Sequence, residues 1–172
     1  MTVFSQPPYD AHDAEAEQAV LILRAKSSPC WKLPFARPEL GALVTAMLRP
    51  TAHAHARLEL SILDDAAMAE LHAQSLGLSG PTNVLSFPAR DDSRTRPAPQ
   101  KAGAYAPPES HRESSPFLGW MALCADALAR ECFLYGQDPE EHCIRLLAHG
   151  LAHLLGHEHG PEMDRLCGEL EA

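Results

Sequence analysis

The sequence predicts one small domain of the α/β (α+β) class, in which a short mixed sheet of about four strands packs with helices. Three observations lead to this prediction. Apolar stretches with strand and helix periodicity alternate along the chain. The length of 172 residues is enough for one hydrophobic core and too short to suggest two. Hydrophobic residues make up 45% of the chain and charged residues 22%, as in ordinary globular proteins, and no segment repeats.

The first part of the chain is expected to contain a strand and a helix. Residues 1–17 are polar and predict a flexible leader, so that the domain would span residues 18–172. Residues 19–26 are a short apolar run that ends in charge, which predicts a strand. A helix is expected to begin near Pro38 and to stop at Pro50, because apolar residues recur between them at helical spacing.

The middle of the chain predicts two further strands and a helix. Residues 57–64 alternate between apolar and polar side chains, which is typical of a strand with one buried face. Asp64 or Asp65 can cap the helix that follows. After a glycine-containing loop, residues 84–87 predict a short strand, and residues 88–116 predict a proline-rich surface loop.

The last part of the chain carries the most informative segment. Residues 117–124 predict a strand, and the helix after it is expected to close at Gly136. Pro139 then opens a helix near the C-terminus that is expected to bind a metal ion. Strands and helices are therefore interleaved around one sheet.

The predicted metal ligands of that helix follow the pattern HxxxHxxGxxH. His149 and His153 are four residues apart and share one face of a helix, where two imidazoles can bind one ion at about 2.0–2.1 Å. Gly156 can end the helix in a left-handed conformation and turn the chain, so that His159 returns to the same ion. Three imidazoles without a fourth protein ligand are typical of a catalytic zinc site, in which water fills the open position. We expect one Zn²⁺ per chain, although nickel and copper also accept imidazole.

The residues around these histidines restrict the chemistry. Zinc proteases with the HExxH helix use a glutamate after the first histidine as general base, and Gly150 stands there in this chain. Glu158 is the nearest carboxylate and either orients or deprotonates the metal-bound water, as the catalytic residue, or is a solvated residue of the turn or a partner of one of the histidines. His157 is expected to support a ligand or to face solvent, and six other histidines are expected at the surface: His12, His53, His55, His72, His111 and His142. The pattern therefore favours a metal-dependent hydrolase that is not a protease.

Composition restricts the partners and the cellular compartment that are expected for this protein. The net charge of −9 argues against a surface built for nonspecific nucleic-acid binding, but it does not exclude a local basic groove. The five cysteines form no CxxC pair and fit free thiols in a reducing compartment. The N-terminus has no signal-peptide pattern, and no stretch approaches the length of a membrane span. A cytoplasmic protein without a membrane partner is expected, and its oligomeric state is left open.

Two segments in the right order resemble the signatures of the bacterial YbeY endoribonucleases. HGLAHLLGHEH (149–159) is similar to the family pattern HGxLHLxGYDH, and PTNVLSFP (81–88) is similar to P-T-(D/N)-V-L-S-F-P. FLGWMALC (117–124) resembles the LGD-(I/L)-V-I strand of the same family. The resemblance covers roughly residues 57–170. It implies a small α/β fold with the metal site on a helix beside the sheet.

The resemblance also implies an activity and a set of site residues. The family consists of zinc-dependent, single-strand-specific endoribonucleases that act in 16S rRNA maturation and ribosome quality control, so single-stranded RNA and ribosomal particles are the implied partners. The implied metal ligands are His149, His153 and His159. Thr82, Asn83 and Ser86 would line the substrate cleft, although the first two are equally typical of a turn that bonds its own backbone. The attacking group is left open between water and the RNA 2′-hydroxyl.

The chain departs from the family pattern beside this cleft. Leu76 stands where the family carries an arginine, and both nearby lysines are absent. Arg90, or Arg94 and Arg96 farther along the loop, could supply the missing phosphate contact, and Trp120 replaces the aspartate of the LGD segment. Two alternatives therefore accompany the ribonuclease prediction. One is a metal-dependent hydrolase with a non-RNA substrate, and the other is a non-catalytic, ribosome-associated zinc protein.

Overall fold

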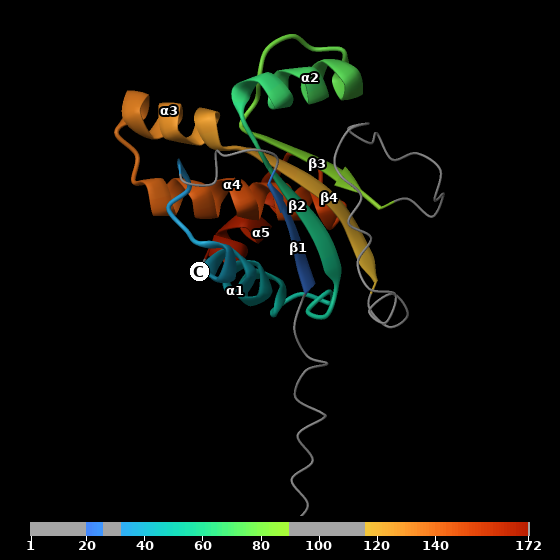
Figure 1. The fold of residues 1–172 in the computed structure, drawn as a ribbon. Coiled ribbons are helices and arrows are strands. Elements are labelled where there is room, and N and C mark those ends of the chain that lie inside the picture. Colours follow the sequence, from blue (N-terminus) through green and yellow to red (C-terminus); the bar gives the residue numbers. More distant parts are fainter. Residues whose placement is uncertain (1–19, 26–31, 90–115, 172) are drawn as a thin grey trace, which may run out of the picture.

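A computed structural model describes residues 20–25, 32–89 and 116–171 of the chain (Figure 1). The predicted leader and most of the predicted proline-rich loop, Arg90 included, lie outside the described residues. The elements in chain order are β1 (Val20–Ala25), α1 (Arg37–Leu48), β2 (Arg57–Leu63), α2 (Asp65–Leu76), β3 (Val84–Pro88), β4 (Phe117–Cys124), α3 (Ala125–Tyr135), α4 (Pro139–Leu154) and α5 (Pro161–Glu171). None of the helices in this described part is long and apolar enough to cross a membrane.

The four strands form one mixed sheet in the order β1-β2-β4-β3. β1, β2 and β4 run parallel, whereas β3 pairs antiparallel with β4 and forms an edge (Figure 1). The predicted α/β class with a mixed sheet is confirmed. β3 extends one residue beyond the predicted strand, because Pro88 still pairs with Gly119.

Local signals in the sequence set the ends of the helices. Asp64, rather than Asp65, caps α2, since its Oδ1 accepts a hydrogen bond of 2.8 Å from the Ala67 amide. Gly136 ends α3 in the left-handed region at φ 63°, where a residue without a Cβ carries no steric penalty. Asp138 caps α4 through bonds of 3.0 and 3.1 Å from the amides of residues 140 and 141.

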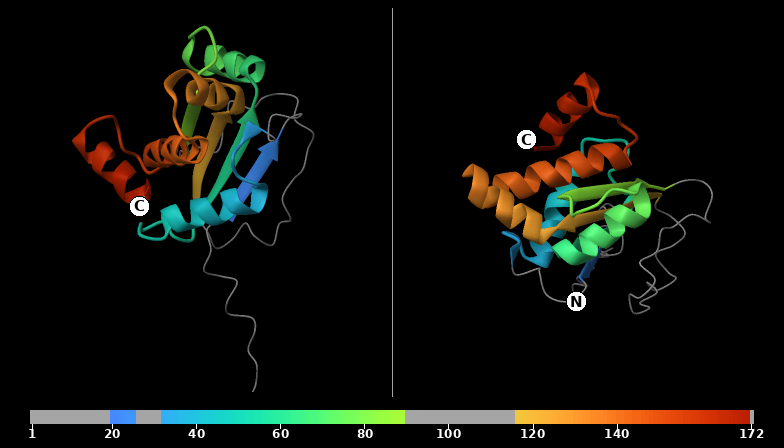
Figure 2. Two further views of the ribbon diagram at one scale, coloured as in Figure 1. Left: turned by 90° about the vertical axis from the view of Figure 1, so that its left-hand side faces the viewer. Right: turned by 90° about the horizontal axis from the view of Figure 1, so that it is seen from above.

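Two cores cover the two faces of the sheet. One face packs against α1 and α4, with α5 outside them, and α2 lies on the other face (Figure 2). The prediction that residues 57–64 have one buried face is wrong, because every residue from Leu58 to Leu63 is buried. β2 lies between β1 and β4 under helices on both sides, so even Glu59 and Ser61 are enclosed, and the Ser61 hydroxyl accepts a 2.9 Å bond from Trp120 Nε1.

The helix α5 was not among the predicted elements. It follows the histidine loop and returns across α4, with Met163 and Leu170 buried (Figure 2). Pro161 at its start, with Leu166 between the two buried residues at helical spacing, is the signal that could have predicted it. Its packing places the loop 155–160 between two helices and so limits where the third histidine can lie.

Candidate metal centre

The structure brings His149, His153 and His159 together. The first two lie in the last two turns of α4, and Gly156, at φ 90°, turns the chain after the helix. One ligand nitrogen from each histidine lies within 4.8 Å of the others. The ring centroids are 4.8 Å apart for His149–His153 and His153–His159, and 5.3 Å apart for His149–His159. The spacing HxxxHxxGxxH therefore produces the convergence that was expected of it.

The tautomer of His153 suits a metal ligand. Its Nδ1 lies 3.0 Å from the backbone carbonyl oxygen of His157. A carbonyl oxygen can only accept a hydrogen bond, so Nδ1 carries the hydrogen and donates it. This leaves the lone pair of Nε2 free for an ion, and a bond of this kind fixes the ring orientation of metal-binding histidines in general.

Electrostatics keeps His149 in the form that binds metals. Burial lowers the pKa of His149, and the neighbouring His153 and His159 lower it further. His149 is therefore neutral at neutral pH, as a metal-binding imidazole must be. Among the described residues, no other set of three or more His, Cys, Asp or Glu side chains converges in this way. The donor set fits zinc, and three ligands leave a coordination position open.

Gly150 sits between the first two histidines because α4 packs very closely against the sheet. A Cβ at this position would lie 2.1 Å from Met121 Sδ, 3.1 Å from Ser86 Oγ and 3.2 Å from Val84 Cγ2. The Ser86 hydroxyl donates a 2.9 Å hydrogen bond to the Gly150 carbonyl oxygen. The position that holds the general base in HExxH proteases therefore faces the sheet here and has no room for a side chain.

The predicted catalytic residue Glu158 lies on the exposed side of the histidine loop. Its side chain is exposed, and it borders an open hollow of about 430 Å³ that is lined by residues 156–162. This hollow includes His159, so Glu158 and one proposed ligand face the same space.

The other predicted site residues lie on or beside β3. Asn83 Oδ1 accepts a 2.8 Å bond from the Val84 amide, and its Nδ2 lies 3.3 Å from both carboxylate oxygens of Glu131. Ser86 is bonded to α4 as described above, and Thr82 is half-buried. Leu76, at the position of the family arginine, is 58% exposed at the end of α2.

The sequence reasoning missed a buried histidine. His142 was expected at the surface, but only 7% of it is exposed, and its Nε2 lies 2.7 Å from Glu131 Oε2. It precedes His149 by seven residues, or two helical turns, and therefore shares the buried face of α4. That spacing was visible in the sequence, whereas the partner on α3 was not.

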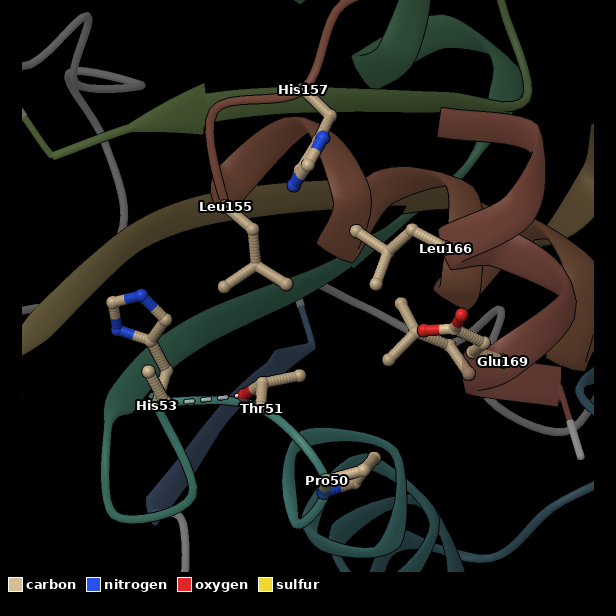
Figure 3. Close-up of a pocket in the computed structure, with 9 residues that line it drawn as sticks. Pro50, Thr51, His53, Leu155, His157, Leu166 and Glu169 are labelled. Atoms are coloured by element: carbon tan, nitrogen blue, oxygen red, sulfur yellow. Dashed lines mark hydrogen bonds between the residues drawn. The ribbon is translucent and has the colours of Figure 1, made fainter. Parts of the chain in front are cut away.

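His157 supports the site through its backbone, which contacts the His153 ring. Its carbonyl oxygen holds His153, while its ring lines a separate pocket of about 230 Å³ between the turn after α1 and helix α5 (Figure 3). Leu155 and Leu166 line the same pocket, and His53 lies across it (Figure 3). His157 therefore contributes its backbone, not its ring, to the arrangement of the other three histidines of the segment 149–159.

Comparisons with known proteins agree with this geometry. The family model described as Endoribonuclease YbeY matches residues 33–167. An Endoribonuclease YbeY of Nitratidesulfovibrio vulgaris is 43% identical over 139 residues, which cover 79% of this chain and 85% of the relative. That of Oleidesulfovibrio alaskensis is 38% identical, covering 88% and 90% of the two chains. The solution structure of TM1509 from Thermotoga maritima has the same fold, with a TM-score of 0.56, 14% identity and coverage of 88% and 87%. The chain therefore belongs to the Endoribonuclease YbeY family.

Proposed function

We propose that this protein is a zinc-dependent endoribonuclease that cuts single-stranded RNA in 16S rRNA maturation and ribosome quality control. The observation that carries the proposal is the convergence of three imidazoles within 4.8 Å, in a chain of the Endoribonuclease YbeY family. One Zn²⁺ binds per chain. The partners are single-stranded rRNA and ribosomal particles. The setting is the cytoplasm, which suits the four free thiols of the described chain.

Each proposed residue has a defined part in this activity. His149, His153 and His159 hold the zinc ion, and bound zinc supplies Lewis-acid stabilisation of the charge that develops on a phosphodiester. Glu158 accepts a proton from the attacking group, because it is a carboxylate at the hollow that contains His159. The substrate-binding residues are Thr82, Asn83, Ser86 and Arg90. The side chains of Asn83 and Ser86 are bonded within the protein, so these two shape the cleft while Thr82 and Arg90 contact RNA.

A modified RNA substrate can reveal which group attacks the phosphodiester. Attack by the RNA 2′-hydroxyl requires that group next to the scissile phosphate, whereas attack by water does not. An RNA with a single 2′-deoxy nucleotide at the cleavage position separates the two routes. Cleavage that persists at this nucleotide assigns the attack to water, and its loss assigns the attack to the 2′-hydroxyl.

A second candidate function follows from the exposed Leu76. A leucine in place of the family arginine removes a phosphate-binding cation beside the cleft, and the net charge of the chain is −9. Both observations favour a metal-dependent hydrolase whose substrate is not RNA. Such an enzyme would bind zinc through the same histidines but would show no RNA affinity that weakens with salt.

The deciding experiment is cleavage of a labelled single-stranded RNA by purified protein of known zinc content. His153→Ala removes one proposed ligand, and His55→Ala is the matched control, since His55 is exposed on the turn before β2. We expect cleavage that requires zinc, disappears in His153→Ala and persists in His55→Ala. Bound zinc without any cleavage of RNA, at low salt as well as high, would reject the ribonuclease and favour the other hydrolase.

A further inference from the structure

We propose that Glu131 and His142 are positioning residues of the catalytic site. With Asn83 they form a chain of hydrogen bonds that fixes the strand bordering the substrate cleft against the helix that carries the metal ligands. The inference rests on the proposed ribonuclease function. It assigns a role to two residues outside the group of three converging histidines.

The chain of bonds begins at the N-terminal end of β3. The Asn83 side chain accepts from the Val84 amide at 2.8 Å and reaches both Glu131 oxygens with its Nδ2 at 3.3 Å. The Asn83 carbonyl oxygen accepts a 2.8 Å bond from the Cys124 amide at the end of β4. Backbone and side chain of Asn83 are thus both engaged, and the neighbouring Thr82 is placed by them.

The series of hydrogen bonds ends on α4. Glu131 Oε2 accepts a 2.7 Å bond from His142 Nε2, and the His142 side chain is only 8% exposed. A hydrogen bond to a carboxylate is stronger than one between neutral groups, and a weakly solvated site strengthens it further. The bond therefore resists small displacements of α4 relative to α3 and β3.

A second bond joins the same strand to the same helix. Ser86 donates to the Gly150 carbonyl oxygen at 2.9 Å. Residues 142 and 150 are about 12 Å apart along a helix, and residues 83 and 86 are about 10 Å apart along a strand. The two connections are therefore widely spaced, and together they fix the angle between β3 and α4 as well as their separation.

Loss of the connection through Glu131 would leave the Ser86 bond as the described side-chain hydrogen bond between β3 and α4. Pairing with β4 still holds the strand, so the expected change is a small shift of its N-terminal end relative to α4. The displacement would be largest at the far end of β3, where Thr82 lies, while His149 and His153 stay on their helix. Misplacing a substrate-binding segment by about 1 Å can lower a rate by about 100-fold. We expect a fall in kcat/KM for RNA of about 10- to 100-fold, with unchanged zinc affinity.

Exchanging the carboxylate between the two partners tests this role. Asn83→Asp alone places two carboxylates opposite each other, and Glu131→Gln alone replaces one of the two oxygens that face the Asn83 amide with a second NH2 group. The double variant Asn83→Asp/Glu131→Gln again pairs an amide donor with a carboxylate, and residue 131 can still accept from His142. Each single variant is expected to lose activity as above, and the double variant is expected to recover to within about threefold of the wild type.

Zinc affinity and a stability control separate positioning from damage to the fold. Leu71→Ala leaves a cavity in the core between α2 and the sheet, so it should lower the urea midpoint without changing kcat/KM. Wild-type cleavage combined with unchanged kcat/KM in both single variants would overturn the positioning role alone. Single variants that lose activity only in step with bound zinc, or a double variant that recovers nothing, would also overturn it. A wild-type protein that binds zinc but cuts no RNA would instead reject the proposed function, and the positioning role with it.

Discussion

Replacing Gly150 with alanine tests whether close packing of α4 on the sheet holds the metal centre. An added Cβ would lie 2.1 Å from Met121 Sδ, whereas ordinary contacts begin at 3.4 Å, so one of the two must move by about 1.3 Å (3.4 − 2.1). Met121 is completely buried, and the neighbouring Ser86 and Val84 close the remaining space. Overpacking of this kind costs about 1–3 kcal/mol of unfolding free energy.

A matched glycine isolates this cost from helix propensity. Gly168 lies inside α5, and a Cβ there would meet nothing within 4 Å. Alanine in place of a helical glycine stabilises by about 1 kcal/mol, so Gly168→Ala should raise Tm by a few degrees. Both variants gain the same propensity, so the difference between them is the packing term. We expect Gly150→Ala to be about 1–3 kcal/mol less stable than Gly168→Ala.

Urea unfolding of both variants measures this difference, and zinc titration measures its effect on the site. A shifted helix moves His149 and His153 away from His159, so zinc affinity should fall in Gly150→Ala and not in Gly168→Ala. Met121→Ala provides space for the new methyl group and should therefore lose less stability in the Gly150→Ala background than in the wild type. Equal stability of the two glycine variants, within about 0.5 kcal/mol, would refute the packing argument.

Substitutions at three further positions test the fold around the site. Gly119→Ala should destabilise by about 2–6 kcal/mol, because φ is +139° and the new Cβ would lie 2.3 Å from the carbonyl oxygen of Phe87; an unchanged urea midpoint would contradict this. Asp64→Ala should cost about 1 kcal/mol through loss of the α2 cap, and Asp64→Asn should retain most of it. The hydrogen bond from Lys32 lowers the pKa of Asp126 in the folded protein. The Asp126 carboxylate therefore stabilises the fold at pH values above its pKa in the unfolded chain, which is about 4. This contribution is lost as the pH falls through the pKa of the folded protein. The free energy of unfolding, measured from pH 7 to pH 3, should therefore depend less on pH in Asp126→Asn than in the wild type. Identical pH profiles of the two proteins would contradict a stabilising role of this carboxylate.

The convergence of the three histidines could be predicted because its determinants are local. A separation of four residues places His149 and His153 on one face of any helix, and Gly156 marks the turn that returns His159. The same holds for the helix ends at Asp64 and Gly136, where the required conformation depends on a few neighbouring residues.

The features that were missed depend on partners distant in the sequence. The alternation in β2 predicted a polar face, but Ser61 is buried under Trp120, 59 residues later in the chain. His142 looked like one more surface histidine, because no pattern connects it to Glu131 on the preceding helix. Burial of a polar residue is favourable only with a hydrogen-bonding partner, and a single sequence does not identify that partner.

The two parts of the proposed zinc site differ in their attachment to the fold, and this difference has a kinetic consequence for zinc binding. His149 and His153 belong to a helix with nine buried residues, whereas His159 is exposed on a short loop. Opening of a loop requires far less free energy than unfolding of a core helix. Zinc exchange should therefore proceed through opening of the loop 156–160, at a rate independent of global unfolding. A chelator would remove the ion from a domain that remains folded, in contrast to zinc fingers, which unfold when their metal is lost.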